Sequence, residues 1–143
     1  MVSIKFVGAM KLEGAAERIH TDLVYARDEA VSKVVWHGVS YEADPINTYE
    51  IYTITGTLDT HTLVEDPAKW GSSLVINVED KYGVKIDGVD FDGGNKVEFD
   101  PLGVPYEEKG GVELTAQGSI VISYSGETKT IYVTPQTGRI RIQ

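Results

Sequence analysis

A glycine-rich segment near the middle of the chain carries the residue types that could bind a hard cation. Asp87–Asn95 reads Asp-Gly-Val-Asp-Phe-Asp-Gly-Gly-Asn, and carboxylate oxygens are the ligands that Ca²⁺ prefers. An EF-hand loop needs a bidentate Glu at its twelfth position, whereas this segment runs directly into Lys96. Asp-Gly-Gly-Asn is also typical of a tight turn. We therefore interpret the segment as a turn, with an ion site as the second interpretation.

Other patterns for metal or nucleophilic chemistry are weak. The three histidines, His20, His37 and His61, are far apart and form no His-x-x-x-His pair, and the chain has no cysteine. Thiolate nucleophiles and Cys-based zinc sites are thereby excluded. No Gly-x-Ser-x-Gly elbow is present. The sequence predicts no catalytic residue, no metal ligand and no cofactor. A small hydrolase is a third hypothesis. The chain has 22 acidic residues that could supply the two carboxylates of such an active site. Their spacing in the sequence does not identify a pair.

Aromatic residues offer one possible binding chemistry. Eight tyrosines and two tryptophans could line a saccharide-binding face, although such residues are also favoured in half-buried strands. Trp70, between Lys69 and Gly71 in a predicted loop, is the one aromatic that merits a carbohydrate test. A secreted or surface carbohydrate-binding β module is therefore the alternative hypothesis.

Charge and length narrow the class of protein. The chain has 143 residues and a formal net charge of −9, with a pI near 4.7. Nucleic-acid binding depends on clustered Lys and Arg, so no nucleic-acid partner is expected. The length suits one domain over residues 1–143. No stretch reaches the ~20 apolar residues that a membrane-spanning helix needs.

The strongest local pattern predicts a long helix at about residues 9–33. Apolar residues recur in steps of three and four, which places them on one face of a helix. This predicted packing face contains Leu12, Ala16, Ile19, Leu23, Ala26 and Ala30. The predicted polar face contains Glu13, Glu17, Arg18, Asp22, Arg27 and Asp28. An alanine-rich stripe buries little area by itself, so we expect a β-sheet to cover it.

The region from about residue 34 to residue 143 reads as strands separated by turns. Alternation is clearest in residues 119–124, 128–134 and 139–142, and the short turns between them predict a three-stranded meander. Further strands are predicted at residues 34–41, 48–55, 74–78, 84–89 and 97–99. The predicted class is therefore α+β, with a long N-terminal helix packed on antiparallel sheets.

The order of these parts resembles the H-type minor pseudopilins of type II secretion and the related FimT-like minor pilins. The first similar segment is the helix, where Leu23, Ala26, Arg27, Glu29 and Ala30 match an L-x-x-A-R-x-E-A pattern. The second is an F-x-x-x-G-x-P turn, and the third is a closing hairpin. The matching residues of the turn and hairpin are Phe99, Gly103 and Pro105, then Thr137, Gly138 and Arg139.

The resemblance implies a pilin-like fold and a structural subunit without catalysis. Its partners would be other pilin or pseudopilin subunits and the inner-membrane assembly platform. A preceding transmembrane segment with a methylated N-terminus would anchor the subunit. Ile4, Phe6 and Val7 would then be the last turns of a longer helix whose first half lies in the membrane. The implied location is the bacterial inner membrane with a periplasmic domain, or an extracellular pilus. Without the membrane segment, we expect the domain to be monomeric.

Overall fold

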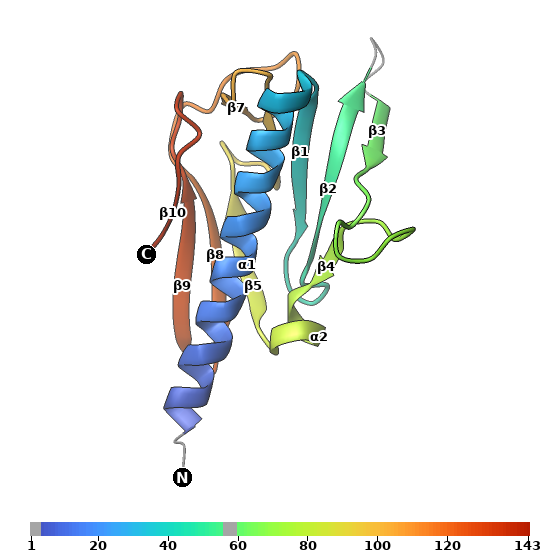
Figure 1. Cartoon of the computed structure of the whole chain (residues 1–143). Coiled ribbons are helices and arrows are strands. Elements are labelled where there is room, and N and C mark those ends of the chain that lie inside the picture. Colours follow the sequence, from blue (N-terminus) through green and yellow to red (C-terminus); the bar gives the residue numbers. More distant parts are fainter. Residues whose placement is uncertain (1–3, 56–59) are drawn as a thin grey trace.

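The computed structural model describes residues 4–55 and 60–143, with the backbone alone for residues 4–7 and 9. One long helix, α1 (Ile4–Lys33), runs beside two antiparallel sheets (Figure 1). This is the α+β architecture that the sequence predicts. The helix begins at Ile4, before the predicted start at Ala9. The side chains of Ile4, Phe6 and Val7, which the resemblance assigns to a membrane helix, lie outside the described residues.

The larger sheet has six strands in the order β3-β2-β1-β6-β7, and β4 also pairs with β2. All its pairings are antiparallel. The bounds of its strands are β1 (Trp36–Glu42), β2 (Thr48–Thr55), β3 (Thr60–Leu63), β4 (Val75–Asn77), β6 (Lys96–Phe99) and β7 (Pro105–Tyr106).

The smaller sheet has four strands in the order β10-β9-β8-β5. The last three strands of the chain form the predicted meander, and β5 pairs antiparallel with β8 to complete the sheet. The bounds of its strands are β5 (Lys85–Asp90), β8 (Gly118–Tyr124), β9 (Glu127–Val133) and β10 (Ile140–Ile142).

The middle of the chain differs most from the prediction. The segment predicted as a strand at residues 74–78 is split between β4 and a short helix, α2 (Val78–Tyr82). The Asn77 side chain accepts a hydrogen bond from the Asp80 backbone N–H, and Gly83 ends the helix at a φ of +70°. These are the usual N-terminal and C-terminal caps of a helix. The sequence does not predict strands β3 and β7. Each is short and forms only by pairing with a neighbouring strand, β2 or β6 respectively.

The core lies between α1 and the inner faces of both sheets. The helix contacts strands of the larger sheet, β1 and β6, and strands of the smaller sheet, β8, β9 and β10. Leu12, Ile19 and Leu23 fill the space between the sheets, while the alanines let the helix backbone approach them closely. No helix within residues 4–55 and 60–143 is both long and apolar enough to cross a membrane.

We predict that Leu23→Ala destabilises the domain much more than Thr21→Ala. Leu23 is completely buried, so truncation leaves a cavity and costs about 2–5 kcal/mol of unfolding free energy. Thr21 is exposed on the same helix, and its truncation changes that free energy by about 0.5 kcal/mol or less. Urea denaturation monitored by circular dichroism measures both. Equal effects of the two changes would show that α1 is not packed as described.

Candidate functional site

The structure places every residue of the predicted packing face in the core. Each of Leu12, Ala16, Ile19, Leu23, Ala26 and Ala30 is at most 3% exposed. Ala15, which the sequence pattern left out, is equally buried. The opposite side of α1 is polar, and Glu13, Glu17 and Asp28 are exposed there. The helix therefore packs on the sheets along one side and presents a mainly acidic side to the solvent.

The three segments that carry the family resemblance meet near the C-terminal end of α1. The Arg27 Nη1 donates to the Gly138 carbonyl at 3.1 Å, and its Nε donates to Asp28 at 3.1 Å. Gly103 lies beside the Arg27 side chain, and Gly138 lies against the Gly103 carbonyl. Residues separated by 111 positions in the chain, Arg27 and Gly138, thus join the helix to the closing turn.

A tight turn after β6 supplies the middle segment of this junction. Phe99 is fully buried and pairs with Pro105 of β7. The Asp100 carboxylate accepts hydrogen bonds from the backbone N–H groups of Leu102 and Val104, both at 2.9 Å. Gly103 has a φ of +83°, a left-handed conformation that favours glycine. The motif residues of this segment therefore shape a turn.

The closing turn lies between β9 and β10. Thr134 and Arg139 are joined by a backbone hydrogen bond, and the Thr137 hydroxyl accepts one from the Arg139 N–H at 3.2 Å. Thr137 and Arg139 are exposed, whereas Gly138 is buried with a φ of +69°. The remaining motif residue, Glu29, is not part of the junction and forms an ion pair with Lys33 at 2.7 Å.

One carboxylate on α1 is buried, although the sequence pattern places it on the exposed polar face. Asp22, assigned to the polar face, is only 5% exposed. It accepts a hydrogen bond from the Tyr49 hydroxyl at 2.6 Å and one from the Arg18 Nε at 2.9 Å. Burial and the adjacent carboxylate raise the pKa of Tyr49 well above its ordinary value, so the hydroxyl remains a donor. Helical spacing shows only which side of α1 a residue lies on, so it could not predict that Asp22 pairs with Tyr49 of β2.

A second buried carboxylate lies on the face of the larger sheet turned away from α1. Gly38 of β1 is in register with Tyr52 of β2 and Glu98 of β6. A Cβ on Gly38 would lie 2.5 Å from the Tyr52 ring, so only glycine lets that ring cross β1. The Tyr52 hydroxyl donates to Glu98 at 2.6 Å, and the backbone N–H of Lys109 donates to the other Glu98 oxygen at 2.7 Å.

The three histidines serve different contacts. The His20 Nε2 donates to the Ile140 carbonyl at 3.1 Å, which ties α1 to β10. His37 is buried beside the Val35 carbonyl, and burial lowers its pKa. His61 belongs to β3, where its ring stacks on Tyr52 at 4.3 Å between centroids. In the described part of the chain, no group of three His, Asp or Glu side chains is placed to hold a metal ion.

The segment 87–95 contains a turn between β5 and β6, with hydrogen bonds between Phe91 and Gly94. The Asp90 carboxylate accepts from the Gly93 N–H at 2.8 Å. The Asp92 carboxylate accepts from Thr115 and Ala116, and these hydrogen bonds lower its pKa. Both aspartates are therefore used to hold the turn and to fasten it to the loop before β8.

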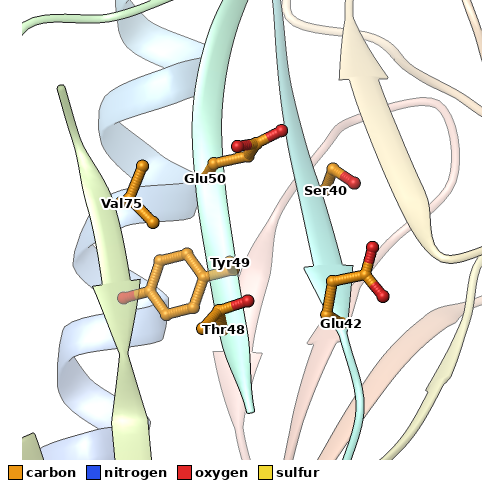
Figure 2. Close-up of a pocket in the computed structure, with 6 residues that line it drawn as sticks. All are labelled: Ser40, Glu42, Thr48, Tyr49, Glu50 and Val75. Atoms are coloured by element: carbon orange, nitrogen blue, oxygen red, sulfur yellow. The ribbon is translucent and has the colours of Figure 1, made fainter. Parts of the chain in front are cut away.

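A small depression on the larger sheet is lined by two carboxylates, those of Glu42 and Glu50. Figure 2 shows Glu42 of β1 and Glu50 of β2 around Ser40, with Thr48, Tyr49 and Val75 completing the lining. The depression encloses about 80 Å³, whereas sites for drug-sized ligands are ~300–1,000 Å³. It is too small to enclose a sugar ring and its attacking water, so it provides no support for the hydrolase hypothesis.

We predict that Gly138→Ala weakens the domain more than Gly126→Ala. Both glycines have a left-handed φ, which costs about 1–2 kcal/mol for alanine. At Gly138 the new Cβ would also clash with the Gly103 carbonyl oxygen, whereas at Gly126 it would meet nothing within 4 Å. The added overpacking costs about 1–3 kcal/mol. The difference in unfolding free energy between the two variants measures the cost of the clash at the junction. A difference of zero would contradict the close contact between Gly138 and Gly103.

Two buried tyrosines provide a matched test of the Asp22 contact. Tyr49→Phe removes the donor to a buried carboxylate and should cost about 1.5–3 kcal/mol of unfolding free energy. Among the described residues, the fully buried Tyr41 hydroxyl has no hydrogen-bond partner. Tyr41→Phe should therefore be neutral or stabilising. Denaturant midpoints of the two variants check this, and the opposite order would contradict the hydrogen-bond assignment.

Comparison with solved structures identifies the fold. No family model matches the sequence, and no curated protein matches it. The minor pseudopilin EpsH from the type 2 secretion system of Vibrio cholerae superposes with a TM-score of 0.66 at 12% identity, over 93% of this chain and 96% of that one. The type IV minor pilin FimU of Pseudomonas aeruginosa superposes with a TM-score of 0.63 at 16% identity, over 94% and 90%. This chain therefore has the pilin-like fold of minor pseudopilins and type IV minor pilins.

Proposed function

We propose that this chain is the globular domain of a minor pilin or pseudopilin that assembles with other pilin-like subunits and catalyses no reaction. The observation that carries the proposal is the packing of one long helix on two antiparallel sheets, shared with EpsH and FimU over at least nine-tenths of each chain. We further propose that a membrane helix precedes α1 and anchors the subunit in the bacterial inner membrane. The domain then lies in the periplasm or in an assembled pilus.

The exposed side of α1 supports an assembly role. Met10, Glu13, Glu17, Thr21 and Asp28 lie on this side and are all exposed. A helix whose other side is occupied by its own sheets has only this side available for neighbouring subunits. Head-to-tail contacts of this kind build open filaments. We propose that the neighbours are other pilin-like subunits, assembled by an inner-membrane platform of type II secretion or of a type IV pilus.

The aromatic residues give little support to the carbohydrate-binding alternative. A saccharide face needs several exposed rings, but Tyr41, Tyr49 and Tyr52 are all buried. Within the described residues, Trp70 is the only Phe, Tyr or Trp whose side chain is exposed. The carbohydrate-binding hypothesis is therefore supported by one exposed ring, Trp70, without neighbouring exposed aromatic residues among those described.

A photo-crosslinking experiment in the source bacterium tests the assembly proposal. We expect a photoreactive residue at Thr21, on the exposed side of α1, to crosslink to subunits with pilin signal sequences when the full-length protein is expressed. A photoreactive residue at Ser125, in the turn between β8 and β9, is the matched control and should give far less of these products. Mass spectrometry of the crosslinked bands identifies the partners. Crosslinks only to proteins without a pilin signal sequence would disprove an assembly role.

A further inference from the structure

One loop displays a tryptophan to solvent and is braced by hydrogen bonds of its own. Trp70 is 94% exposed and lies in the loop between β3 and β4, the light green segment of Figure 1. Inside the loop, the Asp66 N–H donates to the Ser72 carbonyl at 2.7 Å, and the Gly71 N–H donates to the Glu65 carboxylate at 2.8 Å. The Ala68 N–H donates to the Asp66 carboxylate at 2.8 Å. Trp70 is therefore presented on a structured support.

A mostly apolar groove lies between the same loop and α1. It encloses about 290 Å³, close to the lower limit of ligand-binding pockets, ~300 Å³. Leu74, only 2% exposed, lies at its base. Tyr25 of α1 lines one side, and Pro67 and Ala68 of the loop line the other. Asp66 also lines the groove, and its carboxylate, which accepts from the Ala68 N–H, has further acceptor sites for an N–H donor. Arg18, Thr21 and Asp22 of α1 complete the lining.

The two features are complementary. An indole ring is flat and apolar with one N–H donor, which suits an apolar groove lined by the Asp66 carboxylate. Because Trp70 and the groove belong to the same loop, a two-fold axis beside that loop would bring each tryptophan to the groove of the other copy. Such reciprocal use of one surface is the definition of an isologous contact.

One pair of opposite charges supports a second copy as the occupant, although each copy carries a net charge of −9. Lys69 is exposed beside Trp70, and Glu17 is exposed on α1, four residues before the groove residue Thr21. Residues four apart lie on the same side of a helix. Insertion of Trp70 would therefore bring Lys69 of one copy toward Glu17 of the other. We propose that this chain associates weakly with a second copy by reciprocal insertion of Trp70 into the groove between α1 and the 64–74 loop.

The proposed contact is small and should be weak. Each copy contributes only one short loop and one groove, so we expect the contact to bury less than the ~1,200–2,000 Å² of stable interfaces. We expect a dissociation constant on the order of 1 mM, so the isolated domain is monomeric at micromolar concentration. Tethering to a membrane or filament raises the effective concentration to the millimolar range. That cellular role rests on the proposed assembly function, whereas the contact itself can be measured in solution.

Trp70 fluorescence offers a direct measurement. The chain has two tryptophans, so Trp36→Phe leaves Trp70 as the only indole and keeps an aromatic ring beside Tyr106. As the concentration rises from about 1 µM to about 1 mM, we expect the emission maximum to shift to the blue. We also expect the mass from light scattering to rise from one copy toward two. An unchanged maximum with a one-copy mass throughout would disprove the contact.

Three variants separate this contact from general association. Ala68→Arg fills the groove at an exposed position and should abolish the blue shift, and Trp70→Ala should abolish the rise in mass. Mixing these two variants should partly restore association, because one intact groove then meets one intact Trp70. Val112→Ala, which truncates an exposed apolar residue distant in sequence from the loop, is the control and should associate normally. Circular dichroism verifies that each variant is folded.

The outcomes test this inference separately from the assembly function. If the mass rises equally in the Ala68→Arg variant, the copies associate through another surface. If an oligosaccharide shifts the Trp70 emission at micromolar protein, Trp70 belongs to a saccharide site. Loss of the solution contact with persisting crosslinks from Thr21 to pilin-like subunits would remove this inference alone. The solution contact without such crosslinks would retain this inference and remove the assembly function.

Discussion

The close approach of α1 to two sheets at once is the constraint on which the rest of the structure depends. Each sheet has one apolar face, and the two faces are covered by the same helix. A helix of large residues would hold the sheets apart, whereas Ala15, Ala16, Ala26 and Ala30 bring its backbone close to them. The larger Leu12, Ile19 and Leu23 then fill the space that remains. One side of α1 must therefore contain both small and large residues.

This constraint also decides which polar side chains α1 can carry near the sheets. A polar group that is taken out of water needs a hydrogen-bond partner, and three side chains on α1 find partners in different parts of the β region. Asp22 accepts from Tyr49 of β2, His20 donates to β10, and Arg27 donates to the turn before β10. Since these contacts reach both sheets, they fix the rotation of the helix as well as its position. The apolar stripe alone would tolerate a small rotation.

The sequence predicted features that depend on local periodicity. The helix, the C-terminal meander and the α+β class follow from steps of three and four or from alternation, which are visible in a single segment. It missed β3, β7 and the burial of Asp22, because each depends on a partner elsewhere in the chain. Asn47 is the clearest example, since its buried side chain accepts from the Ile86 N–H and donates to Asp44 and Glu79. The residues around Asn47 in the sequence resemble an ordinary turn and contain no sign of these distant contacts.

The same limit applies to the junction of the motif segments. The pattern around Arg27, Gly103 and Gly138 could be recognised by resemblance, but their mutual contact depends on the folded chain. Gly138 must be glycine because the Gly103 carbonyl occupies the space that a Cβ would need. The residues around each glycine in the sequence do not show this contact. Arg27 lies six residues before the end of α1, so the junction joins the C-terminal part of the helix to turns of both sheets. If the subunit is held through the beginning of α1, as we propose, force would reach the domain along that helix. Contacts near the far end of α1 would then keep the sheets attached to it.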